Sequence, residues 1–290
     1  MKKIIVEKEY DGYEIGNYLK EKHEYSSRRL RNLEIYLNGK RIKNNSKKIR
    51  KLNRIVIVEK DKTTNIRPIK MDLKIVYEDE NLLVVNKDPF LVVHPTQKKT
   101  DITLANGIVY YFQETIGKNM VPRFFNRLDM DTSGLIIITK NAHTQTFLSE
   151  KGEVKKKYMA IVDGIVEKDN FLIDIPIGKV GDELKRIELS EKDGGKHALT
   201  AIKVLKRDEE RKISLVEAEL FTGRTHQIRA HLSIIGHTIV GDKLYGSKFS
   251  DIKRQLLHSY SLNLKLPDDN KKLDIKIELP DDMKNFLKVN

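Results

Sequence analysis

The sequence predicts an α+β protein with a mixed, largely antiparallel central sheet and flanking helices, preceded by a small basic α/β module. Short apolar runs bounded by turn residues recur along most of the chain, and each has the length of a strand. Helical periodicities are fewer and interrupt the strands at irregular intervals. This order favours a mixed sheet over regular βαβ winding.

The N-terminal module is predicted to span residues 1–62. Residues 1–10 alternate like an edge strand, and residues 13–23 carry apolar side chains at helical spacing. Ser26 is a candidate N-cap for a second helix. Asn38-Gly39 indicates a hairpin turn, and Ile55–Val58 closes the module as a strand.

Basic residues are concentrated in this module. The formal net charge is +13, and residues 1–60 hold 17 Lys and Arg against 8 Asp and Glu, an excess of 9. Cations at the start of the second helix oppose the helix macrodipole, and an external anion would offset that cost. The module is therefore predicted to bind RNA, although a solvated basic cap on the larger domain is the alternative. The candidate RNA-binding residues are Arg28, Arg29, Arg31, Lys40 and Arg41.

A polar linker, residues 63–72 with Pro68, leads to the larger domain at 73–290. The pattern predicts strands at 75–77, 82–85, 157–162 and 214–221, and several short strands within 165–210. It predicts helices at 102–116, from Ala142 to near Gly152, and at 228–235. Asn141 is the expected N-cap of the second helix, and Gly236 ends the third.

Composition excludes several classes of protein. The chain has no cysteine, so it has neither disulfides nor thiolate metal sites. No apolar run approaches the roughly 20 residues of a membrane span, and the start lacks the apolar core of a signal peptide. His226 and His231 are five residues apart without the glutamate of a zinc-protease helix. We therefore expect a cytoplasmic protein without a metal or other cofactor.

The stretch from Asn126 to Gly134 holds an arginine and two aspartates and runs directly into the apolar strand Leu135–Thr139. A strand buried on both faces is a rigid support for a catalytic group. Taken alone, Asp129 could instead be a turn cap. Tyr158 could be a core residue, and Arg224 a surface phosphate contact.

Taken together, these segments resemble the RluA family of pseudouridine synthases. The resemblance rests on Arg127–Gly134, on Thr222–Arg229 and on the Gly-His and Gly-Asp pairs at 236–237 and 241–242. The N-terminal module resembles, more loosely, the small RNA-binding domain named for a ribosomal small-subunit protein. The chain departs from the family at Asn126, where histidine is usual, and at Asp88-Pro89-Phe90, where the proline is displaced and a glycine is missing.

The resemblance implies an isomerase that turns the N1–C1′ bond of an RNA uridine into a C5–C1′ bond without a cofactor. It makes Asp129 the nucleophile, Arg224 its salt-bridge partner and Tyr158 the residue that stacks on uracil and moves a proton. Arg127 would help expel the target base. The other substrate-binding candidates are Leu257, which would line the second ring face, Arg229, His226 and Lys87.

The implied partner is RNA, and a separate basic module favours large-subunit ribosomal RNA over tRNA because extra binding area suits a large substrate. The alternatives are the same chemistry on tRNA and a non-catalytic RNA-binding protein of ribosome assembly. A metal-dependent nuclease is disfavoured because the sequence shows no carboxylate cluster at suitable spacing. We expect a monomer.

Overall fold

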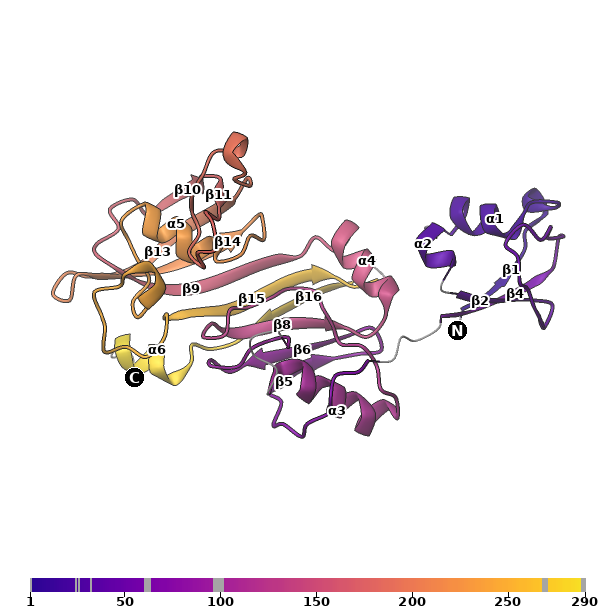
Figure 1. Cartoon of the computed structure of the whole chain (residues 1–290), viewed down its shortest axis with the longest axis horizontal. Coiled ribbons are helices and arrows are strands. Elements are labelled where there is room, and N and C mark those ends of the chain that lie inside the picture. Colours follow the sequence, from indigo (N-terminus) through magenta and orange to yellow (C-terminus); the bar gives the residue numbers. More distant parts are fainter. Residues whose placement is uncertain are drawn as a thin grey trace. The chain divides into compact units, whose positions relative to one another are not determined.

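The computed structural model describes residues 2–23, 25, 27–31, 33–59, 64–95, 102–267 and 271–287. The chain divides into two compact units, Met1–Thr64 and Asn65–Asn290 (Figure 1). The predicted linker begins at residue 63, so most of it falls within the second unit.

The first unit is a small antiparallel sheet with two helices. Its strands are β1 (Lys2–Ile5), β2 (Leu33–Leu37), β3 (Lys40–Arg41) and β4 (Arg54–Glu59), in the order β1-β4-β2-β3. Its helices are α1 (Ile15–Glu21) and α2 (Ser27–Leu30). Asn38 and Gly39 both have positive φ (50° and 81°), the requirement of a tight hairpin turn, so the predicted hairpin is confirmed. The proposed cap Ser26 lies outside the described residues.

The second unit is built on a ten-stranded sheet in the part of the chain that the structure describes. The main order is β10-β13-β14-β9-β15-β8-β6-β5, with β7 beside β8 and β16 beside β15. The strands are β5 (Ile75–Glu78), β6 (Leu82–Lys87), β7 (Arg123–Phe124), β8 (Ser133–Thr139), β9 (Lys155–Asp163), β10 (Asn170–Asp174), β13 (Leu199–Asp208), β14 (Ile213–Leu220), β15 (Leu257–Lys265) and β16 (Lys272–Lys276). All the pairings are antiparallel except that of β15 with β8. The predicted α+β class is confirmed.

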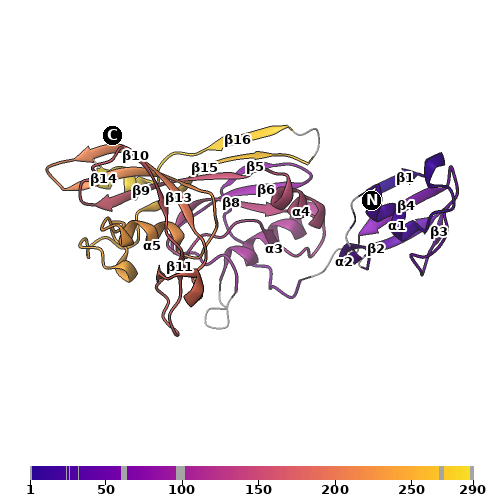
Figure 2. The ribbon, with the colours of Figure 1, turned by 90° about the horizontal axis from the view of Figure 1, so that it is seen from above.

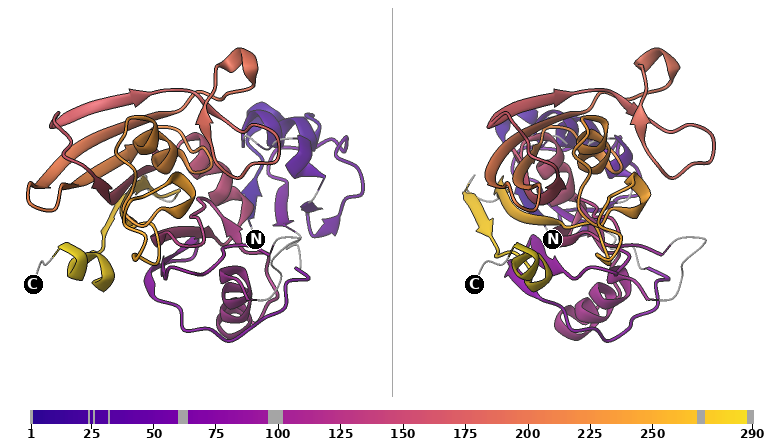
Figure 3. Two further views of the ribbon diagram at one scale, coloured as in Figure 1. Left: turned by 60° about the vertical axis from the view of Figure 1, so that its left-hand side comes forward. Right: turned by 90° about the vertical axis from the view of Figure 1, so that its left-hand side faces the viewer.

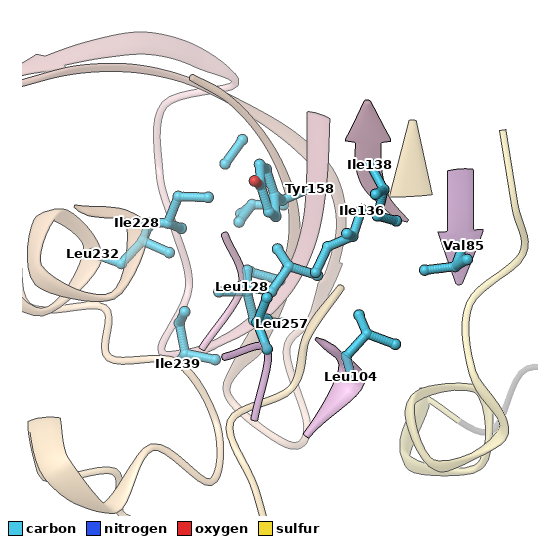
Figure 4. Close-up of a cluster of buried hydrophobic side chains, with 14 of the residues drawn as sticks. Val85, Leu104, Leu128, Ile136, Ile138, Tyr158, Ile228, Leu232, Ile239 and Leu257 are labelled. Atoms are coloured by element: carbon cyan, nitrogen blue, oxygen red, sulfur yellow. The ribbon is translucent and has the colours of Figure 1, made fainter. Parts of the chain in front are cut away.

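Strand β8 is buried on both faces, as its apolar run predicts. Because side chains alternate across a strand, Ile136 and Ile138 enter one core and Leu135 and Ile137 enter another. Figure 4 shows Ile136 and Ile138 within the first of these cores. The strand is thus held from both sides, and the loop before it has a rigid base.

Helices cover both faces of the sheet. Helices α3 (Leu104–Ile116) and α5 (Gln227–Ile234) pack into the same core and lie on one side in Figure 2. Helix α4 (Ala142–Glu150) packs into the opposite core, and Asn141 caps it by accepting a hydrogen bond from the Thr144 amide, as predicted. Helix α6 (Asp281–Leu287) packs against β9, β14 and β15's N-terminal end. No helix among the described residues is long and apolar enough to cross a membrane.

An arm, residues 175–198, extends between β10 and β13 (Figure 3). It carries the short pair β11 (Ile177–Gly178) and β12 (Ile187–Glu188). Its base packs on α5 through Ile177, Ala198 and Ala230.

Several short strands were predicted within 165–210, and β10, β11 and β12 confirm them. The fourth strand of this stretch, β13, is long, and its register with β14 shifts at a bulge between Val204 and Lys206. Strands β15 and β16 and helix α6 were not predicted. Strand β15 is joined to β8 only at His258 with Ser133 and Ser259 with Gly134, a contact across more than a hundred residues that no local pattern reveals.

Candidate active site

Asp129 lies in the loop that enters β8, and its backbone shapes that loop. The carbonyl of Asp129 accepts a hydrogen bond from the amide of Thr132 at 3.1 Å, which closes a tight turn. The strand begins immediately afterwards at Ser133. The carboxylate is therefore presented from the end of the best-buried strand of the sheet, next to the parallel junction of β8 with β15.

The carboxylate of Asp129 is paired with Arg229 of α5. Arg229 Nη1 donates to Asp129 Oδ2 at 2.7 Å. Its Nε and Nη2 donate to the two oxygens of Asp242 at 2.6 and 2.9 Å, a bidentate pair. The side chains of Arg229 and Asp242 are 8% and 1% exposed, so Asp242 fixes the guanidinium in place. Arg229 then presents one free edge to Asp129.

Charge balance keeps this arginine ionised. Burial lowers the pKa of Arg229, but hydrogen bonds to Asp242 and Asp129 and their charges outweigh it and raise the pKa overall. The Tyr245 ring lies 5.2 Å from the guanidinium carbon and adds a cation–π contact. The group facing Asp129 is therefore a permanent cation.

The prediction that Arg224 forms this salt bridge was wrong. Arg224 Nε donates to the carbonyl of His197 in the arm at 2.9 Å, whereas Arg229, five residues later, pairs with Asp129. The turn that caps α5 explains the difference, because Gln227 Oε1 accepts from the Arg224 amide and holds residue 224 outside the helix. Arg229 lies inside the helix, on its buried side.

A pocket opens beside Asp129. Its floor is apolar and contains Tyr158 of β9, Leu257 of β15 and Ile228 of α5, all at most 4% exposed. Figure 4 shows these side chains and Leu128 converging from separate elements. The remaining lining residues are Arg127, Asp129, Thr132, Leu220, Arg224, His226, Gln227 and Arg229. A planar apolar ring would fit between such walls with a carboxylate at its edge.

Tyr158 and His226 are the titratable neighbours of Asp129 in this pocket. Burial, with the nearby charge of Asp129, raises the pKa of Tyr158 to about 12, so its phenol is protonated at neutral pH. His226 Nε2 lies 3.8 Å from Asp129 Oδ2. Burial lowers the pKa of His226, and Arg229 and Arg186 lower it further, against the opposing effect of Asp129. The imidazole is therefore neutral at pH 7.

Lys87 lies beneath the loop, and its predicted contact with substrate was wrong. The residue is 2% exposed, and its Nζ donates to the carbonyls of Asp88, Leu91 and Met130 at 2.8, 3.0 and 2.9 Å. These bonds join the end of β6 to the residue after Asp129. Burial lowers the pKa of Lys87 to about 7, against the raising effect of Asp131.

Arg254 holds the other side of the same loop. Its Nη1 donates to the Asp131 carbonyl at 3.1 Å, and its Nε and Nη2 donate to the carboxylate of Asp282 at 2.6 and 2.9 Å. The residue is 2% exposed. Helix α6, at the far end of the sequence, is thereby tied to the loop that carries Asp129.

Asn126 replaces the histidine that is usual in the family, and its amide bonds to β8. Its Nδ2 donates to the carbonyl of Leu135 at 3.1 Å, and its Oδ1 accepts from the amide of Ile137 at 2.8 Å. One side chain thus completes the hydrogen bonding of the strand where β7 has ended. Asn126 therefore ties the loop before β8 to that strand.

Arg127 is at the mouth of the pocket. Its Nη2 lies 3.4 Å from Thr225 Oγ1, a long contact, and its positive charge lowers the pKa of His94 after the larger effect of burial. Apart from this contact, the Arg127 side chain is exposed.

The basic residues proposed in the first unit are only partly described. Arg31, Lys40 and Arg41 are exposed, and Arg41 is 3.0 Å from Glu34 in an ion pair. Lys40 and Arg41 line a broad depression together with Lys43 and Lys47. The side chains of Arg28 and Arg29 lie outside the described residues.

Two charged residues that hold the site, Asp242 and Arg254, were not predicted from the sequence. The Gly-Asp pair at 241–242 gave a usable signal for Asp242, since a buried aspartate requires a cation. Nothing local marks Arg254.

Comparisons with known proteins agree with this geometry. The family model described as RNA pseudouridylate synthase matches residues 81–234, which include Asp129, Tyr158 and Arg229. A protein of Aquifex aeolicus named as an RNA pseudouridine synthase is 35% identical over 266 residues, covering 87% of this chain and 84% of that protein. Ribosomal large subunit pseudouridine synthase D of Zymomonas mobilis is 34% identical over 237 residues, covering 77% and 74%.

A solved structure shares the fold. Human RNA pseudouridylate synthase domain containing 1 is 25% identical and aligns with a TM-score of 0.57, over 76% of this chain and 96% of that one.

Proposed function

Because this chain belongs to the RluA family of pseudouridine synthases and is an isomerase of RNA uridines, we propose that it modifies large-subunit ribosomal RNA with Asp129 as its nucleophile. One observation carries the assignment of the nucleophile. The carboxylate of Asp129 is held by Arg229 at 2.7 Å at the edge of an apolar pocket that contains Tyr158 and Leu257.

The reaction breaks the N1–C1′ bond of uridine and forms a C5–C1′ bond, with no net change in atoms. A fixed carboxylate can attack or stabilise C1′ as the base leaves, or add to C6 of the ring. Arg229 holds the carboxylate of Asp129 in a fixed orientation, since its own position is set by Asp242. The detached base must remain and rotate, and the buried side chains of Tyr158, Leu257 and Ile228 would form the enclosed surface that retains it.

Tyr158 suits a late proton transfer as well as stacking. The proton at C5 of the rotated base must leave to restore the uracil ring. A phenol with a pKa near 12 is protonated at rest, so it would accept that proton only as another group takes its own. Neutral His226 lines the same pocket as Tyr158, with its Nε2 3.8 Å from Asp129 Oδ2, and is our candidate for such a relay.

Large-subunit ribosomal RNA is favoured as substrate by two observations. The relative in Zymomonas mobilis is named for that substrate and covers 77% of this chain. The first unit adds exposed basic residues, Arg31, Lys40 and Arg41, outside the unit that holds Asp129. A second RNA contact benefits a large structured substrate most. The proposal carries a cytoplasmic location with it.

The test is tritium release from RNA labelled at C5 of uridine. We expect release from large-subunit ribosomal RNA and a loss of at least about a thousandfold in Asp129→Asn, because the nucleophile is removed. Asp88→Asn is a matched control, since Asp88 is about half exposed and pairs with Lys74 at the surface. Release from tRNA but not from ribosomal RNA would contradict the proposed substrate. Release by Asp129→Asn at the wild-type rate would contradict the nucleophile.

A further inference from the structure

A basic cleft lies next to the active-site pocket, between the arm and the loop before α5. Five of the residues that line it are lysine or arginine: Arg127, Lys179, Arg186, Lys196 and Arg224. None of the other described lining residues is acidic or aromatic. A groove of this composition attracts anions, and it offers no aromatic surface on which a base could stack.

The walls of the cleft are fixed in place before any ligand binds. The base of the arm packs on α5 through Ile177 and Ala230, and the amide of Arg186 donates to the Tyr245 hydroxyl at 2.9 Å. On the other side, Arg224 reaches across to the carbonyl of His197 at 2.9 Å. The cations therefore gather without needing an anion to draw them together, and their mutual repulsion is a cost that a bound anion would remove.

Arg186 provides independent evidence for a ligand. Its Nη1 is buried and has no hydrogen-bond partner among the described residues. A buried donor without an acceptor is costly, and more so when it carries charge. A phosphate oxygen in the cleft would accept from it in the geometry that guanidinium groups favour.

The cleft is continuous with the pocket that contains Asp129. Arg127 and Arg224 line both spaces, and Arg127 Nη2 contacts Thr225 of the cleft at 3.4 Å. A strand whose uridine enters the pocket would thus pass its backbone over these two arginines. We propose that the cleft binds the phosphodiester backbone of the RNA strand beside the extruded uridine, with Arg186, Lys179 and Lys196 as the phosphate contacts. The identity of the strand rests on the proposed function.

The test measures how binding of RNA depends on salt. Fluorescence anisotropy of a labelled 12-nucleotide oligouridylate is recorded with the full chain between 50 and 200 mM salt, for wild type and for Arg186→Gln/Lys196→Gln. The slope of log K against log salt is negative, and for single strands each lost phosphate contact reduces its magnitude by about 0.7. For two lost contacts we therefore expect a slope that is less steep by about 1.4. Oligocytidylate should show the same decrease, because backbone contacts carry no sequence information.

Matched variants separate the cleft from charge in general. Lys168→Gln/Lys192→Gln removes the same charge from exposed residues that do not line the cleft, and its slope should equal that of wild type. Lys179→Gln/Lys196→Gln changes only exposed side chains and repeats the test if substitution of Arg186 impairs folding. In tritium release, Lys179→Gln/Lys196→Gln should raise KM and leave kcat unchanged, a split that a purely structural defect would not give.

Equal slopes for wild type and both cleft variants, or equal losses in the cleft and control variants, would overturn the inference. The proposed function is tested separately by turnover. If the slopes differ as expected but no tritium is released, the proposed isomerase reaction fails and the cleft remains an RNA-binding site.

Discussion

At the scale of single residues, the site depends on a chain of charges rather than on one ion pair. Asp242 is 1% exposed and fixes Arg229, and Arg229 presents its remaining edge to Asp129. Asp129 and Arg229 line the pocket, and Asp242 lies behind them. The orientation of the proposed nucleophile thus depends on a buried carboxylate, Asp242.

This arrangement predicts that substitutions of Arg229 and Arg224, two arginines of one motif, affect stability and kinetics differently. Arg229→Gln leaves Asp242 buried without a cation, so we expect a loss of about 3–5 kcal/mol of unfolding free energy and a severe loss of kcat. Arg224→Gln removes a hydrogen bond to the His197 carbonyl, worth about 1 kcal/mol, and should mainly raise KM. Urea unfolding and tritium-release kinetics measure both effects. A larger loss of stability in the Arg224 variant would contradict the assignment.

The lowered pKa of the buried Lys87 side chain predicts that the stability of the fold depends on pH. Its pKa in the folded chain is about 7, below its ordinary value of 10.5. Between these pH values the unfolded chain binds a proton that the folded chain lacks, so stability rises with pH across the window. The cost of the buried charge is fully present below pH 7 and is relieved as pH approaches 10.5.

The measurement compares wild type with Lys87→Met in urea at pH 7 and pH 9.5. Between pH 7 and pH 9.5, the unfolding free energy of the wild type should rise relative to that of the variant by on the order of 2–4 kcal/mol. Where this difference is linear in pH, its slope is about 1.4 kcal/mol per pH unit. The difference between the two proteins removes the contributions of other titrating groups. A difference that is independent of pH would show that Lys87 stays charged throughout.

At the scale of elements, the loop that carries Asp129 is supported where two strands from distant parts of the chain meet. Gly134 has φ of 114°, and a Cβ there would lie 2.2 Å from the carbonyl oxygen of Ser259 in β15. Only glycine permits this approach. The glycine of the motif therefore serves the junction of β8 and β15, five residues beyond Asp129.

Gly134→Ala should consequently disrupt both stability and activity. We expect a loss well above the roughly 1–2 kcal/mol that left-handed backbone costs an ordinary residue, because a clash with backbone is added to that strain. Gly117→Ala is the matched control, since Gly117 also has positive φ (71°) and its Cβ would meet nothing within 4 Å. Thermal unfolding of the two variants separates the cost of the positive φ from the cost of the clash with the Ser259 backbone. Equal losses of stability in the two variants would mean that β8 and β15 can move apart to accommodate the added Cβ without destabilising the fold.

Elements with local signals could be predicted from the sequence, and those defined by distant contacts could not. The Asn38-Gly39 turn, the Asn141 cap and the buried strand β8 depend on residues within a few positions. Strand β15 depends on its pairing with β8 and β9, and α6 depends on Arg254. The site divides in the same way. Its motif identified Asp129, but which arginine faces the carboxylate depends on where α5 begins.

At the scale of the whole molecule, the two units have separate cores. The first unit encloses its own cluster around Tyr18, Leu19 and Ile55, and no described lining residue of the active-site pocket comes from it. Chemistry and the basic cleft belong to the second unit, whereas the first unit contributes exposed cations such as Lys40 and Lys43. The proposed contribution of the first unit to RNA binding can therefore be tested by deletion.

Removal of residues 1–64 should leave kcat on a short labelled stem–loop near that of the full chain, because every described residue of the pocket is retained. On large-subunit ribosomal RNA, kcat/KM should fall by about a hundredfold or more, since the second contact no longer raises the effective concentration of the site. Lys40→Gln/Lys43→Gln in the full chain should reproduce part of that fall, as both lysines are exposed in one depression.

An equal fall on the short and the large RNA would mean that the deletion damages the catalytic unit, which thermal unfolding of the deleted protein would reveal. An unchanged kcat/KM on ribosomal RNA would remove the first unit from substrate binding and, with it, one of the two observations that favour that substrate.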